Sequence, residues 1–293
     1  MRDFKLPFNL YDFFGYLMPG FTLIVLVTMT TDIPVILRIL MNQNGSLFQD
    51  AGYSATLLHS FLTYIHGDVT LAVGMGIFII LSAYTFGHLI AAAAGFLLER
   101  LIVENGMGFP AQNLFVLTPY GIPAGDYRGK IDRFWGNFSK VWLKPLLQKI
   151  FTNYSREYHP DFIERFRRKY RQTFQMEMSS AHDVFWLTFE YIGQHFPTAF
   201  ERANHFINLY GFSRNLAMSF LISAFGVLFI CLFQGCVLSG LVYFLFFFLI
   251  AGVLFWNYLK LFKRLNDEIF RAFLACTPVK SPLFPDKRRH RHE

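Results

Sequence analysis

A stretch of 45 residues, from Asn215 to Leu259, contains no charged side chain. The apolar core of a bilayer is about 30 Å thick and is crossed by roughly 20 residues of α-helix. The stretch is therefore too long for one membrane helix and long enough for two. Gln234 and Gly235 interrupt the apolar run near its middle, which predicts a turn there. The sequence thus predicts a helical hairpin inside a membrane.

Two further apolar segments precede the hairpin and predict two more membrane helices. The first, Phe13–Thr31, is uncharged, and its Gly and Pro residues are tolerated in a membrane when neighbouring helices bond to the freed backbone groups. The second, Leu71–Leu98, has one side chain that titrates near neutral pH, His88. Only 16% of all residues are charged, against about a quarter in soluble domains. We expect an all-α, polytopic membrane protein with four transmembrane helices and a helical cytoplasmic domain.

Basic residues predict the orientation of these helices. The segment from Asp32 to Asp68 has one basic residue against three acidic ones. Residues 99–214 hold 15 Lys and Arg against 11 Asp and Glu, and the tail after Leu259 holds nine against four. Loops rich in Lys and Arg stay in the cytoplasm. Both termini and the central segment are therefore predicted to be cytoplasmic, and no cleavable signal peptide is expected.

The predicted division of the chain follows from these segments. Residues 1–104 hold the first two membrane helices, and 105–212 form a basic cytoplasmic helical domain. The hairpin covers 213–260, and a helical extension with a basic tail covers 261–293. Gly106–Gly129, which is rich in Gly and Pro, predicts an ordered loop at the start of the cytoplasmic domain.

Helical patterns continue from the cytoplasmic domain into the hairpin. Aromatic residues at four-residue steps over Phe162–Phe174 predict an amphipathic helix with a basic opposite face. Ser180 and Asp183 resemble a capping box, which predicts a helix from there to Phe196. Pro197 suits the start of the next helix, which has no strong stop before the third membrane helix. An apolar stripe extends the fourth helix beyond the membrane: Leu261, Phe262, Leu265, Ile269, Phe273 and Leu274.

The cytoplasmic domain carries basic residues with aromatic residues between them. Such a pattern binds phosphate backbones and stacks on bases, and it also binds anionic lipid headgroups. A third interpretation is a solvated helix face, and the sequence leaves all three open. The candidate residues for binding an anionic ligand are Lys144, Lys149, Arg156, Arg165, Arg167, Arg168, Lys169 and Arg171.

Small residues recur along the second apolar segment at helical spacing. They allow helices to approach closely in lipid, which predicts either an oligomer or pore surface or tight packing within one chain. Beside them, His88 is a candidate functional group, or a neutral histidine bonded to Tyr84 or to a backbone carbonyl. No charged residue accompanies His88 in the membrane, which argues against a proton-coupled transporter. The candidate packing residues are Gly76, Ala83, Gly87, His88, Ala91 and Gly95.

No pattern in the chain indicates catalysis. Gly125–Lys130 resembles a phosphate-binding loop but is too short and lacks the Ser or Thr after its lysine. The three cysteines have neither disulfide nor metal-site spacing. We therefore expect no enzyme, no metal and no cofactor.

Two segments, Tyr11–Gly20 and Asn208–Asn215, resemble uncharacterised bacterial four-span inner-membrane proteins, some of which are membrane effectors of anti-phage defence. The likeness covers about a tenth of the chain. It implies the bacterial inner membrane as the location and a pore-forming or membrane-disrupting role.

These observations lead to two functional hypotheses. The first is an oligomeric membrane channel or membrane-disrupting effector, gated by nucleic acid or a nucleotide on the basic cytoplasmic domain. The alternative is a membrane anchor or scaffold that binds anionic lipid or a cytoplasmic protein partner. The bilayer and further copies of the chain are the expected partners in the first hypothesis.

Overall fold

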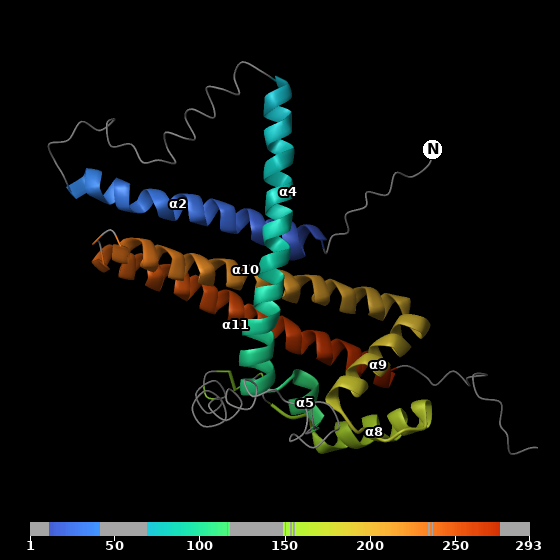
Figure 1. The fold of residues 1–293 in the computed structure, drawn as a ribbon. Helices are drawn as coiled ribbons and strands as arrows, with labels where there is room; N and C mark the ends of the chain where they lie inside the picture. Colours follow the sequence, from blue (N-terminus) through green and yellow to red (C-terminus); the bar gives the residue numbers. More distant parts are fainter. Residues whose placement is uncertain are drawn as a thin grey trace, which may run out of the picture.

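The computed structural model describes residues 12–41, 69–115, 117, 149, 151–152, 154, 156–233, 235 and 237–275. All regular structure in these ranges is helical, which confirms the predicted fold class at this level. In chain order the helices, with η for π-helical segments, are η1 (Phe13–Leu17), α2 (Met18–Met41), α4 (Val69–Ala94), η2 (Gly95–Met107), α5 (Pro110–Phe115), α8 (Pro160–Phe174), α9 (Ala181–His195), α10 (Pro197–Phe233) and α11 (Val237–Ala275) (Figure 1).

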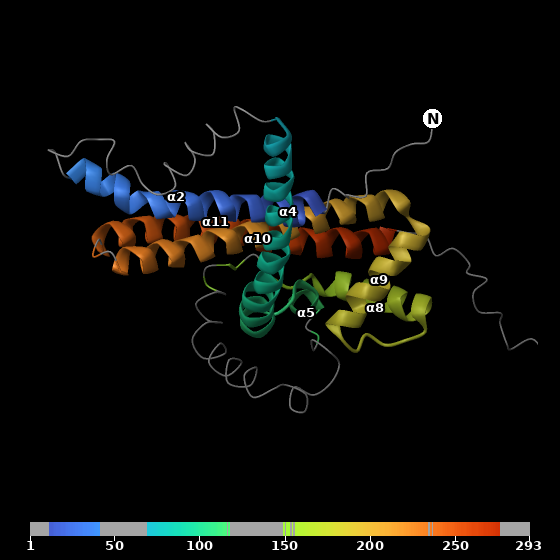
Figure 2. The same cartoon turned by 45° about the horizontal axis from the view of Figure 1, so that its top comes forward.

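The predicted hairpin is present as α10 and α11, which lie side by side along their lengths (Figures 1 and 2). Gly235 stands between the two helices with φ 76°, a left-handed conformation that favours glycine. Its N–H donates to the carbonyl oxygen of Leu232 at 3.4 Å, which closes the turn. The predicted position of the turn is therefore confirmed.

Three helices of the described chain are long and apolar enough to cross a membrane: Val73–Glu104, Pro197–Phe233 and Val237–Ala275. Phe13–Met29 is a shorter apolar helix. Large apolar side chains point outward on these helices, such as Phe229, Leu238 and Leu249, which are 62%, 77% and 66% exposed. Apolar surface of this extent is compatible with a multi-pass membrane protein, because lipid tails would cover it.

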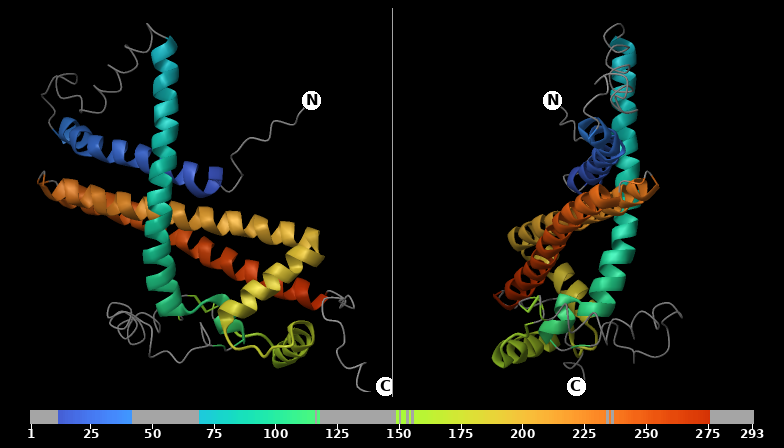
Figure 3. Two further views of the ribbon diagram at one scale, coloured as in Figure 1. Left: turned by 45° about the vertical axis from the view of Figure 1, so that its right-hand side comes forward. Right: turned by 90° about the vertical axis from the view of Figure 1, so that its left-hand side faces the viewer.

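Helix α4 crosses the other apolar helices, whereas α2 runs alongside α10 (Figures 1 and 3). At the crossing, glycines bring two backbones into direct contact. A Cβ atom on Gly87 would lie 2.8 Å from the Cα of Tyr16, and one on Gly20 would lie 2.7 Å from the backbone nitrogen of Gly87. Only residues without a Cβ fit at this spacing, so the two glycines define where the helices cross.

A helical body lies at the end of the hairpin opposite the turn (Figure 1). Helices α5, α8 and α9 pack there on the first part of α10 and the last part of α11, around one apolar core. The stripe predicted on α11 is buried in this core at Phe262, Leu265, Ile269 and Phe273, with Leu274 partly buried against it. Leu261 is buried outside this core. The same two helices thus form both the apolar hairpin and the centre of the body.

Local sequence signals explain where the helices of the body begin. Proline occupies the first position of α5, α8 and α10, where its fixed φ suits a helix and its missing N–H costs no hydrogen bond. The Ser180 hydroxyl accepts a hydrogen bond from the Asp183 N–H at 3.0 Å, which confirms the predicted cap of α9. Helix α10 continues through Gly211 into the hairpin, as expected.

The predicted loop Gly106–Gly129 is wrong at its start. Residues 110–115 form α5, because Pro110 opens a helix whose Leu114 and Phe115 side chains are buried in the core. The π-helical segment η2 also carries the second apolar helix on to Met107. The phosphate-loop-like segment, Lys144 and the basic tail lie outside the described residues.

Candidate functional site

The predicted amphipathic helix is α8, and its basic face is exposed. Arg165, Arg167, Arg168 and Arg171 point away from the core, on the side opposite the buried Phe166 and Tyr170. Two of these cations have partners: Arg168 lies 4.0 Å from Glu164 and Arg171 lies 2.6 Å from Glu177. Arg165 and Arg167 form no ion pair with any residue that the structure describes.

Lys169 differs from the other candidate cations on α8. Its Nζ donates to the carbonyl oxygen of Leu274 at 3.2 Å and lies 5.2 Å from the centre of the Phe273 ring. A cation at the last carbonyls of a helix is stabilised by the helix dipole, so Lys169 attaches α8 to the end of α11. Lys149 and Arg156 are exposed on the segment before α8.

A second contact attaches the start of α8 to α11. The hydroxyl of Tyr158 donates a hydrogen bond to Asp267. Burial and this bond to a carboxylate raise the pKa of Tyr158 well above its ordinary value. On α8 itself, burial raises the pKa of Tyr170 to about 12. The segment around α8 is therefore held on α11 at both of its ends.

A polar junction, which the sequence analysis did not identify, joins the body to the apolar helices. Glu99 of η2 and Arg214 of α10 form an ion pair whose side chains are 26% and 13% exposed. Arg214 Nε also donates to Asn215 Oδ1 at 3.2 Å. Asn215 Nδ2 in turn donates to the carbonyl oxygen of Gly15 in η1 at 2.7 Å. One chain of hydrogen bonds thus connects η2, α10 and η1.

The sequence explains why no α-helical hydrogen bond reaches the accepting carbonyl of Gly15. Pro19 stands four residues later and has no N–H, so it cannot make the α-helical bond to this carbonyl. Ser219, one turn after Asn215, donates to the carbonyl oxygen of Pro19 at 3.1 Å. Polar side chains at four-residue steps in an apolar span (Asn215, Ser219, Ser223) were the signal for this contact, because such residues bond helices together in lipid.

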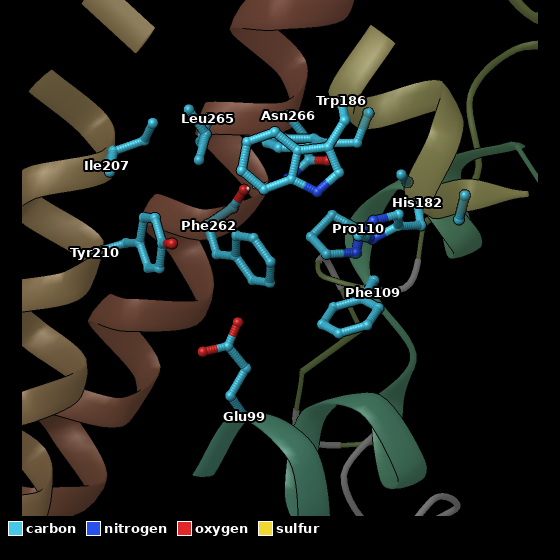
Figure 4. A pocket seen from close by; sticks show the side chains of 13 residues that line it. Glu99, Phe109, Pro110, His182, Trp186, Ile207, Tyr210, Phe262, Leu265 and Asn266 are labelled. Carbon is cyan, nitrogen blue, oxygen red and sulfur yellow. Dashed lines mark hydrogen bonds between the residues drawn. The ribbon is translucent and has the colours of Figure 1, made fainter. Parts of the chain in front are cut away.

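A pocket of about 330 Å³ lies between the junction and the body (Figure 4). Its lining is mainly aromatic and apolar, with the rings of Phe109, Trp186, Tyr210 and Phe262 around it. The Glu99 carboxylate reaches in from η2, below the ring of Phe262. The polar side chains of the lining are Glu99, His182, Tyr210 and Asn266, and small-molecule pockets commonly combine apolar walls with a few such groups.

The small residues of α4 do not act as one surface. Ala83 and Gly87 are buried against η1 and α2 of the same chain, whereas a Cβ atom on Gly76 or Gly95 would meet open space. Ala91 is half-buried. The structure therefore places the middle of the series in an internal contact and leaves both of its ends uncovered.

His88 is exposed and lies among aromatic rings. Its ring stacks on that of Tyr16 with centres 3.9 Å apart, and it meets the edge of the Tyr84 ring at 4.6 Å.

Within the described ranges, no group of three or more His, Cys, Asp or Glu residues is arranged to hold a metal ion. No protein-family model, curated protein or solved structure matches this chain.

Proposed function

We propose that this chain is a four-span bacterial inner-membrane protein, with both termini in the cytoplasm, that acts as an oligomeric channel or membrane-disrupting effector. Its regulator is nucleic acid or a nucleotide, bound by the exposed arginines of α8. The observation that carries the proposal is the length of α10 and α11, which have 37 and 39 residues. Helices of this size are about 55–60 Å long, roughly twice the thickness of the apolar bilayer core.

This length gives the body a direct mechanical link to the membrane. The extra length of α10 and α11 forms the core on which α8 is packed. The Tyr158–Asp267 and Lys169–Leu274 bonds attach both ends of the α8 region to α11. Suppose that α8 can adopt two placements and that a ligand binds one of them more tightly. Binding then moves the equilibrium toward that placement by the difference in affinity, and α11 shifts with α8.

The test measures binding and membrane leakage together. The full chain in liposomes is mixed with single-stranded nucleic acid, and dye release and affinity are recorded at several salt concentrations. Changing Arg165 and Arg167 to Glu should abolish both responses. Changing both to Gln should reduce the log–log salt slope by about 1.4–1.8, because each phosphate contact contributes roughly 0.7–0.9.

A matched control keeps the charge. The Arg165→Lys and Arg167→Lys double variant should retain the salt slope with weaker binding, because Lys contacts phosphate as a point charge and lacks the planar fork of Arg. Wild-type protein that binds neither nucleic acid nor nucleotides in a salt-dependent way would remove the regulator from the proposal.

One observation favours the alternative, a membrane anchor or scaffold that binds anionic lipid or a cytoplasmic protein. The two tightest small-residue contacts, Gly20 with Ala83 and Gly87 with Tyr16, lie within one chain and are not available to a second copy. An anchor predicts no leakage and no current across a bilayer under any ligand. A channel predicts both, so an electrical recording on the purified protein separates the two functions.

A further inference from the structure

A second basic cluster lies on the outer face of α11, at the end of its charge-free stretch. Lys260 follows Leu259 directly, and Lys263 and Arg264 stand three and four residues after Lys260. Residues at this spacing share one face of a helix. Trp256 stands one turn earlier on the same face and is 54% exposed.

These cations line a cavity rather than a flat surface. The segment before α8 covers them with Phe151, Thr152 and Tyr154 and encloses about 460 Å³. The rings of Phe151 and Trp256 meet edge to face with centres 5.4 Å apart and form an apolar wall of the cavity. The Tyr154 hydroxyl donates to the carbonyl oxygen of Gly108 at 3.1 Å and so fixes the covering segment to the end of η2.

The lining has an excess of positive charge. Three cations face one carboxylate, Asp267, and this carboxylate already accepts the hydrogen bond of Tyr158. A ligand with a negative group is therefore favoured. The half-exposed ring of Trp256 stands beside these cations, so the site offers a ligand both positive charge and an apolar surface.

We propose that this cavity binds the phosphate headgroup of an anionic phospholipid. The apolar residues that precede the cavity on the same face of α11, Leu249 and Val253, are 66% and 62% exposed and supply a surface for the acyl chains. Trp residues prefer the boundary between lipid and water, and basic pockets beside membrane helices bind lipid headgroups. The inference rests on the membrane location of the α10–α11 hairpin and is independent of any regulator on α8.

The same cations would also attract inorganic phosphate, and the experiment separates the two sources. Delipidated full-length protein in detergent is titrated with phosphatidylglycerol, phosphatidylcholine or sodium phosphate, and bound lipid is counted by native mass spectrometry. Phosphatidylglycerol should bind tightly, phosphatidylcholine weakly, and phosphate should not displace the lipid at millimolar concentration. Displacement by phosphate, or equal binding of the two lipids, would overturn the proposal.

Variants locate the site. The Lys260→Gln and Lys263→Gln double variant should weaken phosphatidylglycerol binding about 30-fold, because each basic group near an anionic surface contributes roughly a fivefold factor. The matched control, Arg202→Gln with Arg271→Gln, removes two exposed cations of α10 and α11 outside the cavity and should change binding less than threefold. The Lys260→Arg and Lys263→Arg variant retains the charge and should restore binding, which excludes misfolding as the cause. Unchanged binding in the Gln variant would place the lipid elsewhere.

Discussion

Replacing Gly87 by alanine tests the crossing of α4 with η1 and α2 most directly. In the native backbone, the added Cβ would lie 2.8 Å from the Cα and 2.5 Å from the carbonyl carbon of Tyr16. Ordinary van der Waals contact for a Cβ begins at 3.4 Å. Both obstructing atoms belong to the backbone and cannot rotate away, so the two helices must separate.

Two opposing terms set the expected magnitude. In an open helix position, Gly→Ala stabilises by about 1 kcal/mol, because alanine restricts the unfolded chain and favours helix. Overpacking a tight contact costs typically 1–3 kcal/mol. Here the separation also pulls Ala83 and Gly20 apart, since Gly20 has backbone atoms of α4 within 3 Å of its Cβ position. The overpacking cost is therefore at the upper end of its range, and the net destabilisation after the helix gain is about 2 kcal/mol.

The assay is thermal unfolding of the detergent-solubilised protein, followed by helical circular dichroism. Gly87→Ala and Gly20→Ala should each lower the Tm, on the order of 5–10 °C. Gly76→Ala and Gly95→Ala are the controls, since their Cβ atoms would meet open space, and they should leave the Tm equal or higher. If Gly87→Ala were as stable as these controls, the internal crossing would be refuted. A Gly87→Leu variant that stays folded but loses an oligomer would instead assign this surface to a contact between copies.

Three further predictions follow from other parts of the molecule. Changing Arg214 alone to Met should lower the free energy of unfolding by about 3 kcal/mol, because it leaves the partly buried Glu99 carboxylate without its cation. Adding Glu99→Gln should recover most of that loss. A cost below about 0.5 kcal/mol for the single variant would show that water screens the pair. Folding raises the pKa of Tyr170 to about 12, so its hydroxyl ionises more easily in the unfolded chain, and stability is lost as the pH rises from 10 to 12. The Tyr170→Phe variant has no ionising hydroxyl and should lose less stability than wild type over this range. Identical alkaline unfolding curves would contradict this. Cysteines placed at 42–55 should react with an impermeant reagent added outside the cell, and those at 156–171 should not; external labelling of the second range would reverse the proposed topology.

Several elements of the fold follow from the sequence because their causes are local. The uncharged run Asn215–Leu259 is long and apolar enough for two membrane-crossing helices, so it predicts a helical hairpin from its own composition. The start of α9 depends on two residues, Ser180 and Asp183, that lie within one helical turn. The buried stripe of α11 is visible as apolar residues at helical spacing, from Leu261 to Phe273. Each of these signals is complete within a few turns of chain.

Other features depend on neighbours that no local pattern identifies. Lys169 directly follows Arg168 in the basic run, and nothing in the sequence distinguishes the two. Lys169 nevertheless bonds to Leu274, 105 residues away, because α8 packs across the end of α11. Glu99 and Arg214 are 115 residues apart, and in the sequence each resembles an ordinary charge at the end of an apolar run.

The spacing of small residues on α4 shows the same limit. It predicts a close contact, but only the tertiary structure shows that Gly87 lies against Tyr16 of the same chain and that Gly95 has no neighbour at its Cβ position. The sequence alone thus determined which segments are helical and which faces are apolar, since these depend on periodicity and on transfer of side chains out of water. Tertiary structure decided which faces meet and therefore where the ion pair and both cavities lie, because the pairing of faces depends on the shapes of surfaces that are distant in the sequence.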